Sequence, residues 1–134
     1  KLTRSRVPAV THVDGSARPG ERVELTLIWR ARRSLDTNYT VSARLVDAGQ
    51  RKAAQSDGWP QDGAAPTSTW QPGQPVREVR VLEVYPDAAP GAYDLRLAVY
   101  TQDAAGKLVH LPIIPEGGQM LPDHIVLTRV RITP

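Results

Sequence analysis

The sequence predicts an all-β protein, an antiparallel β-sandwich of about seven to nine short strands. Three observations support this prediction. Apolar residues alternate with polar ones in several runs, which is the pattern of half-buried strands. Clusters of Gly, Pro and Asp separate these runs, and no stretch has clear helical spacing. Because 134 residues are enough for one hydrophobic core, we expect a single domain over residues 1–134, with residues 1–6 as a linker or disordered end.

The first half of the chain predicts three strands. Residues 23–31 alternate most regularly, after a turn at Pro19-Gly20, with five apolar positions: Val23, Leu25, Leu27, Trp29 and Ala31. Residues 32–38 form the loop that follows. A second strand begins at Tyr39 and ends at the turn Asp47-Ala48-Gly49, and a short polar strand over residues 51–56 closes a hairpin.

The second half predicts at least four more strands. Residues 76–85 are rich in valine and predict a strand. Which of its faces is buried stays undecided, because Val79 and Val81 share one face while the other apolar residues flank Arg80. A regular alternation from Tyr93 to Val99 runs on to a turn at residues 103–106, and a short strand over 107–114 follows. We expect a loop at 115–122 and a last strand over 124–132.

The segment Pro90-Gly91-Ala92-Tyr93 favours one kind of sandwich. A tyrosine that opens a strand after a proline-glycine corner is typical of the tyrosine corner in immunoglobulin-like and fibronectin-type domains, where the hydroxyl binds nearby backbone. The alternative is an ordinary core tyrosine. The predicted fold is therefore an immunoglobulin-like or fibronectin-type antiparallel β-sandwich.

Composition narrows the possible functions. The net charge of +3 comes from 17 basic and 14 acidic residues, and the basic residues form small scattered groups, so we expect a solvated surface and no nucleic-acid partner. Without cysteine there is no disulfide and no Cys-based zinc site. No apolar run reaches the roughly 18 residues that a membrane-spanning helix needs.

No residue pattern predicts catalysis. The aspartates lie mostly at turns, where Asp binds its own backbone, and no nucleophile motif accompanies His12, His110 or His124. The pairs His12/Asp14 and Asp123/His124 lack the spacing of a zinc or calcium site. We therefore predict no catalytic residue, no cofactor and no metal site, although loop oxygens at Asp57 and Asp62 leave a structural calcium ion open.

The most unusual segment is the loop of residues 57–73, DGWPQDGAAPTSTWQPG, in which two of the three tryptophans lie outside any strand pattern. Exposed aromatic rings can stack on sugar rings while neighbouring polar groups bind hydroxyls, so this loop is the candidate ligand-binding site, with six residues: Trp59, Trp70, Asp57, Gln61, Asp62 and Gln71. Alternatively, both rings fold inward and cap the end of the sandwich, burying about 200 Å² each. We favour the inward arrangement.

Several segments together resemble a bacterial domain found at the extracytoplasmic carboxyl end of multi-span membrane proteins. Those proteins are similar to glycosyltransferases of the protein mannosyltransferase type. The resemblance covers about residues 18–132, and its motifs occur in this order: 25–31 (LTLIWRA), 35–41 (LDTNYTV), 57–60 (DGWP), 66–73 (PTSTWQPG), and 90–93 (PGAY) with 95–100.

The resemblance implies a non-catalytic accessory domain of a membrane-associated glycan-processing protein. Such a domain would lie outside the cytoplasm, tethered to the membrane by a part of the protein that precedes this chain, with the catalytic carboxylates in that membrane part. Its partners would be the rest of the multi-span protein and a glycan or peptide at the Trp59 and Trp70 loop. Two alternatives remain open: a stand-alone hydrolase of glycans or esters, and a structural spacer or adhesion module.

Overall fold

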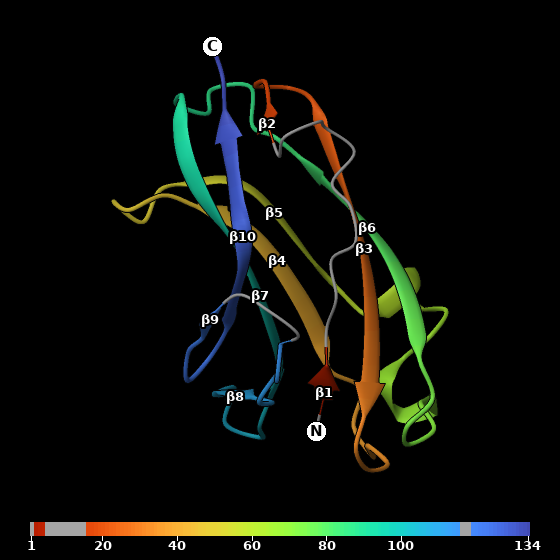
Figure 1. Cartoon of the computed structure of the whole chain (residues 1–134). Helices are drawn as coiled ribbons and strands as arrows, with labels where there is room; N and C mark the ends of the chain where they lie inside the picture. Colours follow the sequence, from red (N-terminus) through yellow and green to blue (C-terminus); the bar gives the residue numbers. More distant parts are fainter. Residues whose placement is uncertain (1, 5–15, 116–118) are drawn as a thin grey trace.

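The computed structural model describes residues 2–4, 16–115 and 119–134, and over these residues the protein is almost entirely β-structure. The strands form two sheets that share one hydrophobic core (Figure 1). The helical elements of the described residues are two short 3-10 turns, η2 (Pro60–Gly63) and η3 (Thr67–Thr69). The all-β prediction is therefore confirmed.

The smaller sheet has three strands in the order β1-β3-β6, and all its pairs are antiparallel. Its central strand, β3 (Arg22–Ala31), is the most regular alternation of the sequence, and every apolar position predicted to face the core is buried. β6 (Val76–Glu83) pairs with β3 along its whole length. β1 (Leu2–Arg4) lies inside the predicted linker end, yet it pairs with β3.

The larger sheet has the order β2-β10-β7-β4-β5. These strands are β2 (Ser16–Ala17), β4 (Thr40–Val46), β5 (Lys52–Gly58), β7 (Gly91–Gln102) and β10 (Ile125–Ile132). β8 (Leu108–His110) pairs with the end of β7 and is shorter than predicted, and β9 (Gln119–Met120) is a two-residue strand inside the segment predicted as a loop. The pairs are antiparallel except β2 with β10.

The core lies between the two sheets and takes side chains from both. Trp29 of β3 and Tyr93 of β7 are its largest fully buried aromatic residues. Leu, Val and Ile side chains make up much of the rest of the core, and burying each one stabilises the folded state by about 1.5–3 kcal/mol. β3 and β7 supply the core with long runs in which buried residues alternate with more exposed ones. These two strands therefore fix the relative position of the sheets.

β6 resolves the register that the sequence left open, and the result is unusual. Val79 and Val81 are exposed, at 42% and 41%, whereas Glu78 and Arg80 lie inside, at 1% and 6% exposure. Leu82 also points inward and is fully buried. The hydrophobic pattern alone could not select this register, because the inward face includes two charged residues that neutralise each other.

The hydrogen bond predicted for the Tyr93 hydroxyl is present. The Tyr93 hydroxyl donates a hydrogen bond to the carbonyl oxygen of Ala89, four residues earlier, at 2.7 Å. Gly91 lies between them with a φ of 147°, a backbone conformation that residues with a Cβ rarely adopt. The bond therefore fastens the Pro86–Pro90 segment to the start of β7.

The edge strands of the two sheets, β5 and β6, meet along one side of the molecule (Figure 1). At one end the strands are joined through backbone, because the Tyr85 amide donates to the Ala53 carbonyl at 2.8 Å. At the other end they diverge, and the Arg80 side chain spans the gap to the carbonyl of Gly58. A cleft opens beside this gap.

Candidate ligand-binding cleft between strands β5 and β6

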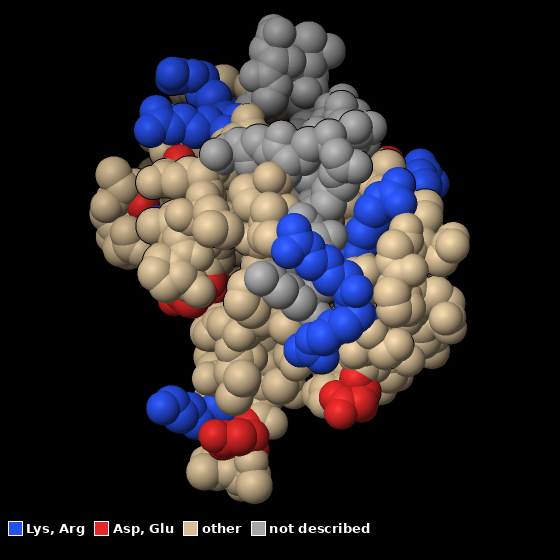
Figure 2. Space-filling view, turned by 60° about the horizontal axis from the view of Figure 1, so that its bottom comes forward, with Lys and Arg blue, Asp and Glu red and all other residues tan. Residues whose placement is uncertain are grey.

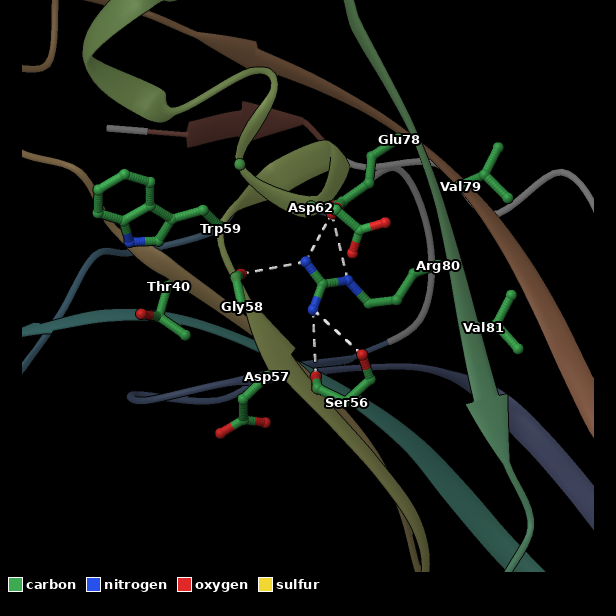
Figure 3. A pocket seen from close by; sticks show the side chains of 11 residues that line it. Thr40, Ser56, Asp57, Gly58, Trp59, Asp62, Glu78, Val79, Arg80 and Val81 are labelled. Atoms are coloured by element: carbon green, nitrogen blue, oxygen red, sulfur yellow. Dashed lines mark hydrogen bonds and ion pairs between the residues drawn. The ribbon is translucent and has the colours of Figure 1, made fainter.

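A cleft of about 730 Å³ lies between the end of β5, the turn η2 and the edge of β6 (Figure 3). This volume falls within the range of small-molecule sites. Its walls combine apolar surface with hydroxyl, carboxylate and guanidinium groups, from these residues: Thr40, Ser56, Asp57, Gly58, Trp59, Asp62, Gly63, Glu78, Val79, Arg80 and Val81. The cleft thus has the mixed chemistry that polar organic ligands need.

A buried ion pair forms the floor of the cleft. The Arg80 guanidinium lies 2.5 Å from Glu78, through Nη2 and Oε2, and Arg80 Nε donates to the same oxygen at 3.2 Å. The other Glu78 oxygen accepts the indole N–H of Trp29 at 3.0 Å. Because buried charges are tolerated only when paired and hydrogen-bonded, each member of this cluster requires the others.

Arg80 also donates hydrogen bonds to backbone carbonyl oxygens at the end of the larger sheet. Its Nη1 donates to the carbonyl oxygens of Val41 at 2.9 Å and Ser56 at 3.2 Å, and its Nη2 donates to that of Gly58 at 3.1 Å. Figure 3 shows the hydrogen bonds of the guanidinium to Ser56 and Gly58. A planar fork of donors suits several fixed carbonyls better than an ammonium group would. Arg80 therefore holds the β5 end at a fixed distance from β6.

Trp59 stands at the mouth of the cleft, and its side chain is 44% exposed. It has an extended backbone (φ −69°, ψ 150°) immediately before η2, and the next residue, Pro60, is buried. A buried proline that begins the turn anchors the chain there and leaves the preceding side chain outside. The exposed indole is therefore a consequence of how η2 is anchored.

The turn after Trp59 has an unusual backbone. Gln61 and Asp62 are consecutive non-glycine residues with φ of 53° and 52°, in the left-handed region. Such conformations cost on the order of 1–3 kcal/mol each and occur most often at binding sites and switches. Gln61 is held there by its amide, which donates to Glu78 at 3.3 Å, and by its side-chain amide, which donates to the Arg77 carbonyl.

Trp70 has the opposite environment from Trp59. It is 4% exposed, and its ring stacks on Trp29 with centroids 6.4 Å apart and planes inclined at 29°. Its indole N–H donates to the Ala65 carbonyl at 2.9 Å. Trp70 is thus part of the core.

The second part of the tryptophan loop is fastened to the segment before β4. The buried Thr67 hydroxyl donates to the Thr37 carbonyl at 2.6 Å and accepts the Tyr39 amide at 2.9 Å. The Ser68 amide donates to the Asn38 side chain at 3.1 Å. These bonds hold Trp70 inward, so the inward arrangement applies to this tryptophan and not to Trp59.

The six predicted site residues separate into three groups. Trp59, Asp57 and Asp62 line the cleft. Gln61 lines a smaller adjoining hollow beside Asp62. Trp70 lies in the core and Gln71 is exposed in a turn outside the lining of the cleft, so the structure does not bring these two into the site.

Asp57 is occupied by other contacts. Its carboxylate accepts the Ser42 hydroxyl at 2.7 Å, the Tyr100 hydroxyl at 3.0 Å and the Gln55 amide at 3.2 Å. Partial burial raises the pKa of Tyr100, and the Asp57 hydrogen bond and negative charge raise it further. Figure 3 shows the Asp57 side chain directed away from Arg80, so it forms the rim of the cleft.

Sequence reasoning missed the β6 half of the site. Glu78, Arg80, Val79 and Val81 lie about 20 positions from Trp59 in the sequence, and the cleft exists only because β6 pairs with β3 opposite β5. One signal was present. The spacing of Glu78 and Arg80 places two opposite charges on one face of a strand otherwise filled with apolar residues.

The histidines and the remaining charges do not converge on the cleft. His110 lies beside Tyr100, with ring centroids 6.1 Å apart, and His124 binds Asp123 at 2.7 Å. The predicted pair His12 and Asp14 lies outside the described residues. Among the described residues no group of three or more His, Asp or Glu side chains is placed to hold a metal ion. Figure 2 shows Lys and Arg in separate groups, with uncharged residues over most of the face viewed.

Comparisons with known proteins add little to this picture. No protein-family model matches the chain, and no curated protein is significantly similar to it. Among solved structures, the chain is similar to Spo0M, a sporulation control protein from Bacillus subtilis, with a TM-score of 0.38 and 14% sequence identity. That match covers 84% of this chain and 49% of Spo0M, so it spans about half of that protein. Within the described residues, no helix is both long and apolar enough to cross a membrane.

Proposed function

We propose that this chain is a non-catalytic, immunoglobulin-like β-sandwich domain that binds a glycan in the cleft beside Trp59. One observation carries the proposal. Of three tryptophans, two are buried at 0% and 4% exposure, while Trp59 is 44% exposed at the mouth of a cleft of about 730 Å³. An exposed indole next to hydroxyl and carboxylate groups offers stacking for a sugar ring and hydrogen bonds for its hydroxyls.

The chemistry of the cleft favours binding over hydrolysis. Glycoside hydrolysis needs two available carboxylates across the scissile bond. Glu78 is bound by Arg80, Trp29 and the Gln61 amide, and Asp57 accepts three side-chain donors. Among the described residues no side chain donates a hydrogen bond to Asp62, which is exposed in the cleft, and a single carboxylate suits a hydrogen bond to a sugar hydroxyl.

The backbone of the turn supports a binding role as well. The left-handed conformations of Gln61 and Asp62 place Asp62 at the cleft beside Trp59. Energetically unfavourable backbone is retained where the surrounding structure requires it, and such residues cluster at ligand sites. A spacer domain would have no need for this turn.

The sandwich type and the cellular setting belong to the same proposal. The tyrosine corner at Tyr93 supports the immunoglobulin-like classification. The sequence resemblance supports an accessory domain outside the cytoplasm, tethered to a membrane-bound glycan-processing protein whose catalytic residues lie elsewhere.

A peptide is the second candidate ligand, because one observation favours it. β6 is an edge strand of the smaller sheet, and it exposes Val79 and Val81 along the cleft. An extended peptide can add to such an edge through backbone hydrogen bonds. Hydrogen exchange separates the two candidates: a bound peptide protects the amides of β6, whereas a glycan stacked on Trp59 leaves them unchanged.

The test of the glycan proposal is a glycan array probed with the purified chain and two variants. Trp59→Ala removes the stacking surface and should abolish the signal. Leu108→Ala removes an apolar side chain of similar exposure, 46%, that does not line the cleft, and should retain the signal. Failure of the parent chain to bind any glycan, or equal binding by Trp59→Ala, would contradict the proposal.

A further inference from the structure

Two arginines lie directly opposite each other on neighbouring strands of the larger sheet. Arg44 of β4 pairs in register with Arg96 of β7. Both point away from the core, because the residues that flank them in their strands are core residues: Ala43 and Leu45 in β4, Leu95 and Leu97 in β7. Like charges that face each other across a strand pair destabilise a sheet. Such an arrangement needs a compensating negative charge.

The described carboxylates on this face have other hydrogen-bond or ion-pair partners. Asp94 pairs with Arg129 at 3.4 Å, and Asp123 pairs with His124 at 2.7 Å. Asp57 accepts its three donors from neutral groups on the same face. Neither Arg44 nor Arg96 has an ion-pair partner among the residues that the structure describes.

The Arg96 guanidinium is incompletely satisfied. Its Nη1 donates to the Gln50 side chain at 3.3 Å, but its Nε is buried and has no hydrogen-bond partner within the described structure. A buried donor without an acceptor is costly, and a charged one more so. Within the described residues Arg96 therefore lacks an ion-pair partner and an acceptor for its Nε.

Both arginines line a hollow of about 140 Å³. The rest of its lining is three polar residues, His110, Asp123 and His124, and two apolar ones, Leu97 and Ala98. This space admits a group of the size of phosphate. The hollow shares no lining residue with the Trp59 cleft.

We propose that this hollow is an oxyanion site for a phosphate group, either the free ion or a phosphate monoester. Two arginines of the lining provide planar forks of donors that match phosphate oxygens. Asp123, which His124 binds at 2.7 Å, also lines the hollow. The site is independent of glycan binding at Trp59, so either proposal can fail without the other.

Phosphate titration followed by NMR tests the site, with the Arg96 Nε–Hε resonance as the local probe. We expect a saturable shift of that resonance with inorganic phosphate. Arg44→Gln and Arg96→Gln should each weaken binding by about tenfold or more, as expected for the loss of a charge-assisted hydrogen bond. Arg129→Gln is the control, because it removes the same charge from an exposed arginine outside the hollow.

Glycerol phosphate in a parallel titration distinguishes the two sources. Equal or tighter binding of the ester assigns the site to a phosphate monoester, and binding of inorganic phosphate alone assigns it to the free ion. The proposal is overturned if neither gives a saturable shift, or if Arg129→Gln weakens binding as much as the two hollow variants do. Thermal unfolding of each variant in phosphate-free buffer confirms that it is folded before titration.

Discussion

The ring of Trp70 stacks on that of Trp29 in the core, with centroids 6.4 Å apart, while Trp59 in the same loop is 44% exposed. The loop is therefore divided in function. Its second half belongs to the core, and its first half presents an indole to a cleft. This division separates stability from binding, and it can be tested one residue at a time.

Trp70→Ala should lower the free energy of unfolding by about 3–5 kcal/mol, because it removes a buried aromatic ring and its contact with Trp29. Trp59→Ala should lower it by less than about 1 kcal/mol, since that side chain is largely solvated. Urea denaturation of both variants measures the difference. Equal losses of stability would contradict the division of the loop.

The pair of Glu78 and Arg80 should show strong coupling. Arg80→Met alone leaves a buried carboxylate and should cost about 3–5 kcal/mol. Combining it with Glu78→Gln, which retains an acceptor for the Trp29 indole, should cost less than the sum of the two single changes. A double-mutant cycle in urea measures the coupling, and additive losses would show that the two charges do not depend on each other.

The hydrogen bond of the tyrosine corner should make a small, specific contribution to the stability of the fold. Tyr93→Phe removes one hydrogen bond to the Ala89 carbonyl and should destabilise the protein by about 1 kcal/mol. Tyr39→Phe is a matched control, because no hydrogen bond from the Tyr39 hydroxyl occurs within the described residues. Thermal unfolding compares the two, and an equal effect would remove the special role of Tyr93.

Tyr100 should titrate above the usual tyrosine range. Burial, and then the hydrogen bond to Asp57, raise its pKa by favouring the neutral phenol. Because the pKa of the folded state exceeds that of the unfolded state, this stabilisation is complete below about pH 10 and is lost as pH rises through the raised value. The difference between the absorbance titration curves of the parent and of Tyr100→Phe isolates the titration of Tyr100.

Asp57→Asn provides the internal check on that titration. Removing the carboxylate charge should lower the pKa of Tyr100 toward its ordinary value, although burial still acts on the ring. An unchanged titration curve in this variant would show that Asp57 has no influence on the phenol.

The sequence predicted most of the fold but only part of the candidate site. Strands β3 and β7 were recognisable because each has one apolar face, so period-two alternation located them. β6 was not resolved, because its buried face includes Glu78 and Arg80 and its exposed face includes two valines. A pattern of hydrophobicity cannot show that two buried charges neutralise each other.

Trp59 and Trp70 could not be told apart from sequence, since both stand near prolines in the same loop. Their environments differ through contacts with distant segments: Trp70 packs on Trp29 of β3, and Pro60 anchors the turn that leaves Trp59 outside. The cleft needs β6 beside the end of β5, which is a property of the sheet order and not of any motif.

Calorimetric titration of the strongest array glycan into the parent chain and into Trp59→Ala tests the glycan cleft most directly. With the melting temperatures of both proteins shown to be similar, we expect Trp59→Ala to bind about thirtyfold more weakly or not at all, as for a tryptophan that dominates a binding site. Trp59→Phe, which retains a ring, should recover part of the affinity. Equal dissociation constants for the parent and Trp59→Ala would contradict glycan binding in this cleft.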